Sequence, residues 1–430
     1  MTNKTIAVVG AGIIGVTSAY MLRLAGYKVV LVDAEHGPAL KTSFANGCQL
    51  SYSYVDAMSS PSLVKKLPKL LLGADPAFRV NLFPDLSLLK WGSRFLWQGQ
   101  AAREQKNTQE LLRLSHYSRQ VLHQLLSQSP LEFAHRESGK LVIYTNPQDF
   151  DNAKARVAQK RAWGCKQEIL TPQECIAIQP SLQRLPKPLA GGIYAATDEV
   201  GDPHRFANQL LDQLVKDTGF EARFNCRIEK IVRKGSSVQS LETSTGSLCA
   251  DAYVWATGAE SLPLLADIGL NVPIYPIKGY SLTVPATESA PDVCITDIDN
   301  KVVVARVGDR LRIAGCADIV GYDPRMDQQR IAHLLQVCRS HFPDAGHYNE
   351  VLNTWAGFRP VTPSSVPIIG QAGADNLFLN MGHGMLGWTL ALGSASLLTA
   401  QVKQQALPID ATGMRPEDHA FNRPRGGAER

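Results

Sequence analysis

The stretch that decides the fold lies near the start of the chain and reads Lys4-Thr5-Ile6-Ala7-Val8-Val9-Gly10-Ala11-Gly12-Ile13-Ile14-Gly15. An apolar run rich in β-branched residues leads into three glycines with the spacing G-x-G-x-x-G, and a helical run follows. A second apolar run, Lys28-Val29-Val30-Leu31-Val32, then ends at Asp33. This order of strand, glycine turn, helix and strand predicts a βαβ unit that binds a dinucleotide.

Each glycine of the turn has a separate task. Gly10 permits the tight turn out of the strand, Gly12 allows a pyrophosphate to approach the backbone, and Gly15 lets the helix pack on the strand. The backbone N–H groups of Ile13 and Ile14 at the helix start are expected to face the phosphates. Asp33, followed by Ala34, can accept both hydroxyls of an adenosine ribose and would repel a 2′-phosphate. The sequence therefore favours FAD or NAD over NADP.

Length and charge limit the remaining possibilities. A chain of 430 residues is too long for one ordinary core, so we expect two interleaved domains. The net charge is +5, from 44 basic and 39 acidic residues, without a long basic run, so nucleic acid is not implied.

The eight cysteines show neither CxxC spacing nor a partnering histidine cluster, so we expect no zinc site and no disulfide framework. Because the first strand starts within a few residues of the N-terminus, we expect no signal peptide and a cytoplasmic protein.

Two apolar segments raise the question of a membrane. Residues 377–402 carry no charge, but their glycines predict a strand, a loop and a buried core helix rather than a membrane span. Residues 63–97 combine leucines and tryptophans with Lys65, Lys66, Lys69 and Lys90, and prolines interrupt them. Two interpretations stay open for this segment: peripheral contact with a membrane surface, or packing of a helix inside a substrate domain.

Other elements follow from periodicity, capping and turn signals. The tail from Ala411 onward is polar and without periodicity, so we expect it to be extended or disordered. The pattern predicts helices over Ala102–Gln128, from Pro147 through Trp163, from a capping box at Thr171, and over Val200–Val215, and strands over Gly139–Tyr144, Phe224–Val232 and Cys249–Gly258.

Five segments, taken together, resemble the flavin-dependent D-amino acid oxidase superfamily, and within it the bacterial D-amino acid dehydrogenases of the small-subunit type. They run in the family's order over nearly the whole chain. They are the glycine fingerprint, Lys41-Thr42-Ser43-Phe44-Ala45-Asn46-Gly47, Tyr275-Pro276-Ile277-Lys278-Gly279-Tyr280-Ser281-Leu282-Thr283, Trp355-Ala356-Gly357-Phe358-Arg359-Pro360-Val361-Thr362-Pro363 and Met381-Gly382-His383-Gly384-Met385-Leu386-Gly387-Trp388-Thr389.

The resemblance implies an α/β fold in which a Rossmann-like FAD domain is interleaved with an α+β substrate domain that contains an antiparallel sheet. A flavin needs a second backbone cradle for its ring, and a nicotinamide enzyme, which the glycine turn alone equally allows, has no use for one. The cradle is Gly382, His383, Gly384, Gly387, Trp388 and Thr389. The resemblance adds Ser43, Asn46, Gly47, Gln49 and Ile228 as further cofactor contacts. Thr257 and Gly258 are expected there because they stand at the carboxyl end of a buried strand, where open α/β sheets bind ligands. Since no cysteine adjoins the cradle, we expect the FAD to be held non-covalently.

On the substrate side, a carboxylate is best fixed by a bidentate guanidinium. Arg306, at the end of an apolar strand, matches the family's carboxylate clamp, and Arg359 matches an arginine near the flavin edge. Tyr280 resembles a tyrosine that holds the carboxylate or closes the pocket, and Tyr52 and Tyr54 are lining candidates. We expect no catalytic side chain, because hydride passes from the substrate Cα to flavin N5, and we assign His383 to flavin contact rather than to proton abstraction.

The resemblance implies oxidative deamination of a D-amino acid. We expect electrons to pass to a quinone-type acceptor, with oxygen as the alternative, and the membrane interpretation of residues 63–97 would place the enzyme on the cytoplasmic face of the inner membrane. Alternatives are oxidation of a cyclic or secondary amino acid of the D-hydroxyproline or sarcosine type, a flavin-binding accessory subunit, and an RNA-modifying protein, against which the missing basic patch argues. We expect the FAD domain to comprise residues 1–60, 195–262 and 350–410, the substrate domain 61–194 and 263–349, and a polar tail 411–430.

Overall fold

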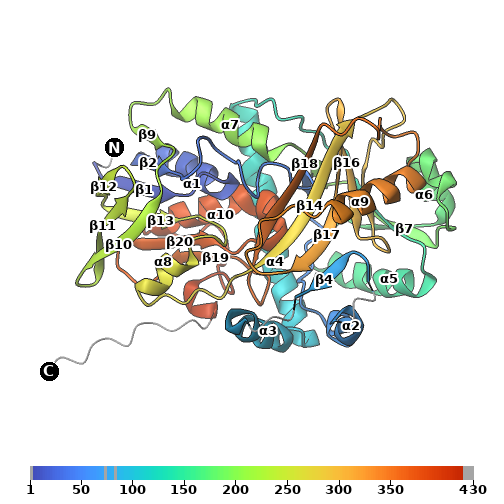
Figure 1. Ribbon diagram of the computed structural model, residues 1–430, viewed down its shortest axis with the longest axis horizontal. Helices are drawn as coiled ribbons and strands as arrows, with labels where there is room; N and C mark the ends of the chain where they lie inside the picture. The colour runs from blue at the N-terminus through green and yellow to red at the C-terminus, as the bar shows by residue number, and fades with distance from the viewer. Residues whose placement is uncertain (1–2, 72–74, 82–84, 420–430) are drawn as a thin grey trace.

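Two large sheets form the two halves of the molecule (Figure 1). The computed structural model describes residues 3–71, 75–81 and 85–419. The first sheet holds the glycine turn and is parallel except for its edge strand β19. Its order is β19 (Ile368–Gln371), β20 (Leu377–Met381), β13 (Ala252–Trp255), β1 (Thr5–Val9), β2 (Lys28–Val32) and β9 (Phe220–Arg223).

Both faces of the first sheet are covered, as a parallel sheet requires. Four helices share one apolar core on one face: α1 (Ile13–Leu24), α4 (Ala101–Gln128), α7 (Pro203–Leu214) and α10 (Gly387–Val402). A second core on the other face joins α8 (Leu262–Asp267) to a small antiparallel sheet of β10 (Ile228–Lys234), β11 (Ser237–Thr243) and β12 (Gly246–Leu248).

The second sheet is mainly antiparallel and occupies the other half. Its order is β18 (Asn353–Val361), β14 (Tyr275–Pro285), β17 (Arg310–Ile319), β16 (Val302–Val307), β15 (Cys294–Asp297), β5 (Lys140–Tyr144), β7 (Gly191–Ala195) and β6 (Glu168–Leu170), and β4 (Phe78–Val80) pairs with β17. Around it pack α2 (Pro61–Leu71), α3 (Leu86–Gln98), α5 (Pro147–Ala162), α6 (Pro172–Ile178), α9 (Gln328–His341) and the 3₁₀ turn η1 (Pro180–Arg184).

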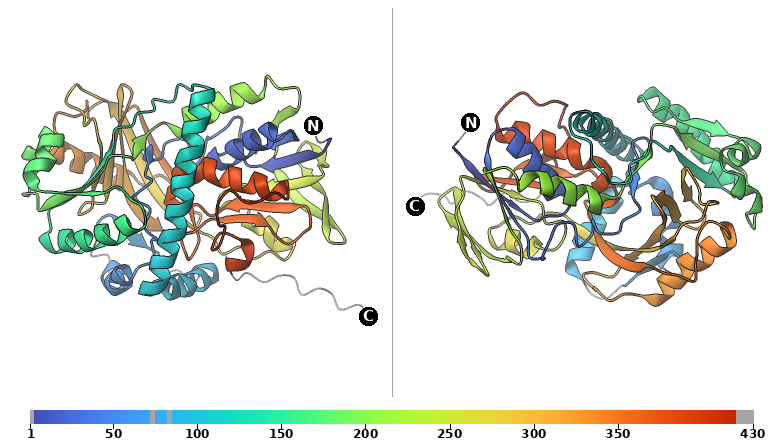
Figure 2. Two further views of the ribbon diagram at one scale, coloured as in Figure 1. Left: turned by 180° about the vertical axis from the view of Figure 1, so that it is seen from behind. Right: turned by 90° about the horizontal axis from the view of Figure 1, so that it is seen from above.

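The long helix α4 runs between the two halves, as the back view in Figure 2 shows. It packs on α10 in the first half. A two-stranded pairing of β3 (Gln49–Leu50) with β8 (Glu199–Val200) brings two distant segments together near the middle of the molecule. The fold is the predicted one: a Rossmann-like unit interleaved with an α+β unit that contains an antiparallel sheet.

The expected elements appear with shifted bounds. The expected helix over Val200–Val215 starts at Pro203, after an Asp202 cap that accepts hydrogen bonds from two backbone N–H groups. The expected strand over Phe224–Val232 is wrong at its start, because Asn225 adopts a left-handed conformation with φ 53° that separates β9 from β10. In the expected domain division, β18 falls into the FAD unit, whereas the structure pairs it with β14 of the second sheet.

The structure shows where the apolar stretch Gly384–Val402 and residues 411–419 lie. The stretch Gly384–Val402 is apolar and long enough to span a membrane by composition, but most of it is buried inside the protein, where α10 packs on α1 and α4. The expectation of an extended tail from Ala411 is wrong for residues 411–419, because Ala411 and Met414 are fully buried in the core beside α4 and α10. These residues end in the 3₁₀ turn η3 (Pro416–His419), and 420–430 lie outside the described residues.

Candidate active site

A cavity of about 860 Å³ lies between the two halves of the molecule and is lined from both sheets. Its walls include the glycine turn after β1, the ends of β13 and β20, the segment from 39 to 58, and the floor formed by β14 to β17. Parallel strands bind ligands at their carboxyl ends, and here the ends of β1, β2, β13 and β20 all open onto this space.

The glycine turn is built as the sequence predicts. Gly10 has φ +98°, and a Cβ there would lie 2.8 Å from the carbonyl oxygen of Ala256. At Gly15 a Cβ would lie 1.6 Å from the carbonyl oxygen of Gly10, so this glycine lets α1 pack on the turn and does not line the cavity. At Gly12 a Cβ would meet only the Oγ of Ser43, at 3.6 Å, so the protein itself leaves the space beside the turn open. This open space is where a pyrophosphate would bind.

Helix α1 starts without a side-chain cap at Gly12, and its first N–H group, from Ile13, donates to Ser43 Oγ at 3.1 Å. Asp33 at the end of β2 lines the cavity beside it. Its carboxylate accepts the N–H of Ala11 at 2.5 Å and the N–H of Glu35 at 2.8 Å, one on each oxygen. These two bonds fix the orientation of the carboxylate and leave each oxygen a lone pair for a ribose hydroxyl.

The second glycine segment connects β20 to α10 through the 3₁₀ turn η2 (Gly384–Leu386). His383 in this segment is buried, and burial lowers the pKa of its imidazole to about 3. Its Nε2 atom and the Oδ1 atom of Asn380 have no hydrogen-bond partner in the described part of the chain, although both residues line the cavity. Two buried polar atoms without a hydrogen-bond partner in one wall of the cavity indicate a polar ligand at this position.

The segment between these two walls carries the remaining predicted cofactor contacts. Asn46 Oδ1 accepts the N–H of Cys48 at 2.8 Å, which holds the turn that exposes Gly47 to the cavity. Apart from Gly15, every predicted cofactor residue lines the cavity: Gly10, Gly12, Ile13, Ile14, Asp33, Ala34, Ser43, Asn46, Gly47, Gln49, Ile228, Thr257, Gly258, Gly382, His383, Gly384, Gly387, Trp388 and Thr389.

Arg359 lies on β18 and points into the cavity from the substrate side. Its guanidinium crosses β14 at Gly279, where a Cβ would lie 2.2 Å from Arg359 Nη2, and its Nη1 donates to the carbonyl oxygen of Cys316 at 2.9 Å. Burial lowers the pKa of Arg359, but an arginine remains protonated in proteins. Among the described residues no carboxylate forms an ion pair with it. A half-buried guanidinium without an ion-pair partner among the described residues is free to bind a carboxylate.

Arg306 is the one predicted arginine that the structure places elsewhere. Side chains alternate along β16, so Val303 lines the cavity while Val302 and Val304 enter the core on the opposite face. Arg306 follows on that opposite face, where it lies 3.6 Å from Asp292 and does not line the cavity. The expectation of a carboxylate clamp at Arg306 is therefore corrected by the strand's alternation.

The three predicted tyrosines differ in position. Tyr280 lines the cavity and donates its hydroxyl to Asp318 Oδ2 at 3.0 Å. Tyr54 also lines the cavity, beneath the ammonium of Lys140 at 4.5 Å from the ring centroid. Tyr52 is wrong as a lining residue, because its ring is buried in the core that includes α4, with the hydroxyl 3.4 Å from Glu199.

Lys140 is a cavity residue that the sequence analysis missed. It begins β5, is almost fully buried, and donates from Nζ to Ser51 Oγ at 2.9 Å. Burial lowers the pKa of its ammonium to about 8, and burial also raises the pKa of neighbouring Asp198 to about 6. Ser51 in turn donates its N–H to Thr389 Oγ1 at 3.0 Å. Ser51 therefore links Lys140 to the start of α10. The one sequence signal is a lysine leading an otherwise apolar strand.

Comparison with known proteins agrees with this geometry. The family model of the FAD-dependent oxidoreductases named DAO matches residues 5–401. The chain is 39% identical over 416 residues to D-amino acid dehydrogenase 2 of Ralstonia nicotianae, covering 94% of this chain and 98% of that protein. It is likewise 39% identical over 416 residues to D-amino acid dehydrogenase of Paramagnetospirillum magneticum, covering 95% of this chain and 98% of the relative.

Solved structures show the same fold at low sequence identity. Glycine oxidase from Geobacillus kaustophilus superposes with a TM-score of 0.75 at 20% identity, covering 99% of this chain and 100% of that chain. L-proline dehydrogenase from P. horikoshii gives a TM-score of 0.74 at 17% identity, with 94% and 95% covered.

Proposed function

Since this chain belongs to the DAO family of FAD-dependent oxidoreductases, we propose that it oxidatively deaminates D-amino acids to 2-oxo acids and ammonia. FAD is the cofactor of the family, and the two glycine walls and the carboxylate of Asp33 fit it. The observation that carries the substrate class is Arg359: a half-buried guanidinium in the cavity wall, without an ion-pair partner among the described residues.

The protein's part in the reaction is orientation. Arg359 would bind the α-carboxylate of the substrate, and the Tyr280 ring would fill the pocket wall beside it. When bound, the flavin supplies the hydride acceptor for the substrate Cα. His383 is neutral above pH 3 because its burial lowers the pKa to about 3, so it can hydrogen-bond to the cofactor without adding charge.

We propose that the FAD is held without a covalent bond. No cysteine adjoins the glycine cradle in the sequence, but Cys48, Cys226 and Cys316 line the cavity. Burial raises the pKa of Cys48 to about 12 and that of Cys316 to about 11, so these two sulfurs are thiols at neutral pH rather than reactive thiolates. Acid precipitation should release the yellow colour into the supernatant.

A substrate screen tests the function directly. The purified flavoprotein is mixed anaerobically with matched D- and L-amino acids, and bleaching of the flavin absorption is followed. Bleaching by D-alanine and other D-amino acids, with the L-enantiomers far slower, is the expected result. Bleaching only by proline-like or N-methyl substrates would move the function to secondary amines, and no bleaching by any amine would leave an accessory flavoprotein.

For the acceptor, we propose a quinone reached from a membrane surface, with α2 and α3 as the contact. Helix α3 is amphipathic: Trp91 and Phe95 pack against β14, while Leu86, Leu89 and Trp97 are 72%, 66% and 52% exposed. Packing therefore accounts for the inner face of α3, and the proposed membrane contact concerns its exposed face. Trp91 Nε1 donates to the carbonyl oxygen of Val361 at 2.8 Å, and Val361 lines the cavity, so α3 lies one layer from the cofactor wall.

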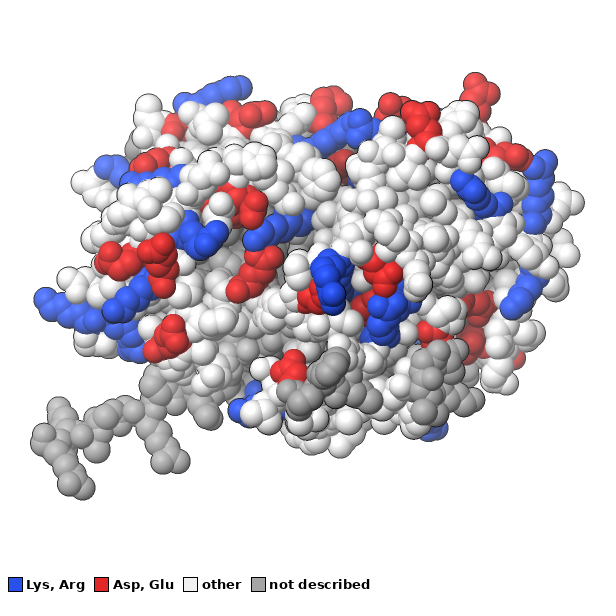
Figure 3. Space-filling view, in the orientation of Figure 1, with Lys and Arg blue, Asp and Glu red and all other residues white. Residues whose placement is uncertain are grey.

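The charge on this surface suits an anionic membrane. Lys65 and Lys66 on α2 and Lys90 and Arg94 on α3 are exposed. Figures 1 and 2 show α2 and α3 next to each other at one edge of the molecule. On the face drawn in Figure 3, by contrast, basic and acidic side chains are interspersed. Apolar side chains flanked by basic ones favour peripheral binding to anionic headgroups.

A further inference from the structure

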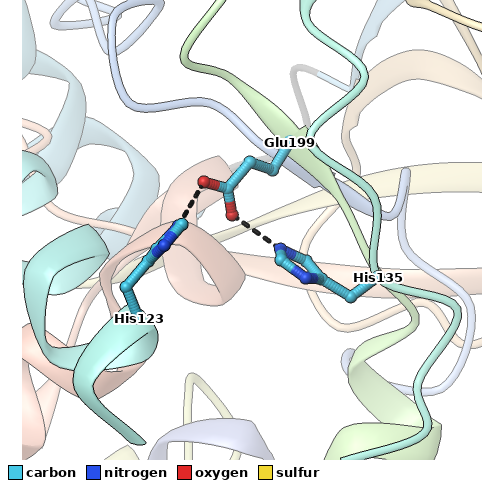
Figure 4. Close-up of side chains that lie close together, drawn as sticks. All are labelled: His123, His135 and Glu199. Atoms are coloured by element: carbon cyan, nitrogen blue, oxygen red, sulfur yellow. Dashed lines mark hydrogen bonds and ion pairs between the residues drawn. The ribbon is translucent and has the colours of Figure 1, made fainter. Parts of the chain in front are cut away.

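A cluster of two histidines and a glutamate lies outside the proposed active site, at the β3–β8 pairing that contains the glutamate. His123 is in the last turns of α4, His135 is in the loop that follows this helix, and Glu199 is in β8. Figure 4 shows both imidazoles pointing at the carboxylate, one at each oxygen. His123 Nε2 lies 2.6 Å from Oε1, and His135 Nε2 lies 2.8 Å from Oε2.

The ligating atoms of the three residues lie within 4.8 Å of one another. Two imidazole nitrogens and a carboxylate oxygen are the donor set of many zinc sites, in which the bonds are about 2.0–2.2 Å long. Donors that share one such ion are roughly 3.3 Å apart, so the present hydrogen-bond distances need to open by under an ångström. Each neutral imidazole would move its proton to Nδ1, which leaves Nε2 free to bind the ion.

The surroundings of the carboxylate also suit a cation. Glu199 is 1% exposed, and Arg119 Nε donates to its Oε1 at 2.9 Å. Arg119 reaches a second carboxylate, that of Glu137, at 3.1 Å. Two carboxylates and one guanidinium give the cluster a net charge of −1 before an ion binds. Arg119 can therefore remain as the hydrogen-bond donor that ligating carboxylates ordinarily have.

We propose that His123, His135 and Glu199 bind one Zn²⁺ ion, with water as the fourth ligand. The water and the entry path lie on the outer side, where the side chain of His123 is 33% exposed. The donor set favours Zn²⁺ over Ca²⁺ or Mg²⁺, which prefer oxygen ligands. The proposal departs from the sequence expectation of no zinc site, which rested on the absence of CxxC spacing and of a partnering histidine cluster, because the fold alone brings His123, His135 and Glu199 together.

The position of the site indicates a structural role. Glu199 pairs with Leu50 across the β3–β8 ladder, and Gln49 beside it lines the cofactor cavity. The ion would tie the end of α4 and the loop after it to this ladder. Zinc binding should therefore stabilise the fold without changing the substrate reaction, and the proposal does not depend on which amino acid the enzyme oxidises.

The test uses the tag-free, flavin-bound, full-length protein after dialysis against a chelator. Zn²⁺ is titrated in competition with a chromophoric chelator, and Co²⁺ is used as a spectroscopic probe at wavelengths beyond the flavin bands. We expect one ion per chain with a Kd on the order of 1 µM or tighter. At about a hundredfold excess of free zinc over Kd, the Tm should rise by roughly 3 °C for a chain of this length.

Four variants decide the assignment. His123→Ala and His135→Ala should each weaken zinc binding by more than about a hundredfold, since even supporting residues around a metal site cost 10–100-fold. His116→Ala, on the same helix but outside the cluster, and Cys249→Ser, which removes an exposed thiol, should bind zinc as the wild type does. Absence of saturable binding in the wild type, unchanged affinity in both histidine variants, or loss of binding in Cys249→Ser would each overturn the proposal.

Discussion

At the scale of single residues, strand alternation decides which arginine reaches the cavity. Arg306 and Arg359 both follow apolar runs. From the sequence alone, both are candidates for the arginine that binds the substrate carboxylate. Arg306 shares the face of Val302 and Val304, which enter the core away from the cavity, whereas Arg359 reaches across Gly279 toward Cys316. Because one position along a strand reverses the direction of a side chain, register must be known before such a residue can be assigned.

The first prediction follows from this difference. Arg359→Ala should lower kcat/KM for a D-amino acid by at least roughly thirtyfold, because loss of one partner of a buried carboxylate pair costs about 2–5 kcal/mol. The flavin spectrum of the variant should stay that of the wild type. Arg306→Ala is the matched control and should change kcat/KM by less than about threefold. A larger loss in Arg306→Ala than in Arg359→Ala would reverse the two assignments.

Lys140 gives a prediction for pH. Its pKa is about 8 in the folded protein and about 10.4 in an unfolded chain, so between these values the unfolded state binds more protons. Stability of the wild type should therefore rise with pH across this window relative to Lys140→Met, by up to about 3 kcal/mol in total.

Thermal unfolding of both proteins at a series of pH values from 7 to 10 measures this difference. Below pH 8 the lysine is charged in both states and the difference between the two proteins should be constant. A wild-type Tm that falls with pH in parallel with that of Lys140→Met would show that the buried ammonium keeps an ordinary pKa.

At the scale of elements, the glycine turn and α1 form one packed unit. Gly15→Ala places a Cβ 1.6 Å from the carbonyl oxygen of Gly10, so the helix or the turn must move. We expect a loss of about 1–3 kcal/mol in stability and a clear drop in FAD retained after gel filtration. Gly92→Ala in α3 is the control, because, apart from the neighbouring backbone of its own helix, no described atom lies within 4 Å of its added Cβ. It should be neutral or stabilising by up to about 1 kcal/mol with full FAD content.

Elements with strong local signals could be predicted from the sequence. The βαβ unit, α4 and the capping box at Thr171 lie where spacing and capping put them, since each depends on contacts a few residues apart. The packed tail at 411–419 and the place of β18 in the second sheet depend on distant partners. The burial of Lys140 and the His123–His135–Glu199 cluster likewise depend on contacts between distant segments. They therefore cannot be predicted from any single stretch of the sequence.

At the scale of the whole molecule, direct contacts link the cavity, strand β18 and helix α3. The carbonyl of Val361, at the cavity wall, is bonded to Trp91 of α3, whose outer face carries Leu86 and Leu89. An enzyme that transfers electrons to a membrane quinone needs its cofactor site close to the lipid. A membrane-binding surface next to the wall of that site would provide this. The buried apolar stretch of α10 offers no such surface, because it packs on α1 and α4.

The last prediction tests this surface. The protein should sediment with vesicles of anionic lipid at low salt, less with neutral lipid, and should be released by salt, since each exposed basic residue contributes about 1 kcal/mol. The double variant Leu86→Ser with Leu89→Ser should bind vesicles roughly tenfold more weakly, because two exposed leucines no longer enter the interface. Leu24→Ser is the matched control: Leu24 is 64% exposed at the end of α1, in the other half of the molecule, and its loss should leave binding unchanged. Reduction of a water-soluble quinone analogue should be equal in all three proteins, while reduction of a long-chain quinone held in the vesicles should fall only in the double variant. If Leu24→Ser loses as much binding as the double variant, or if oxygen supports the full turnover rate, α3 is a packing element alone and the acceptor is reached from water.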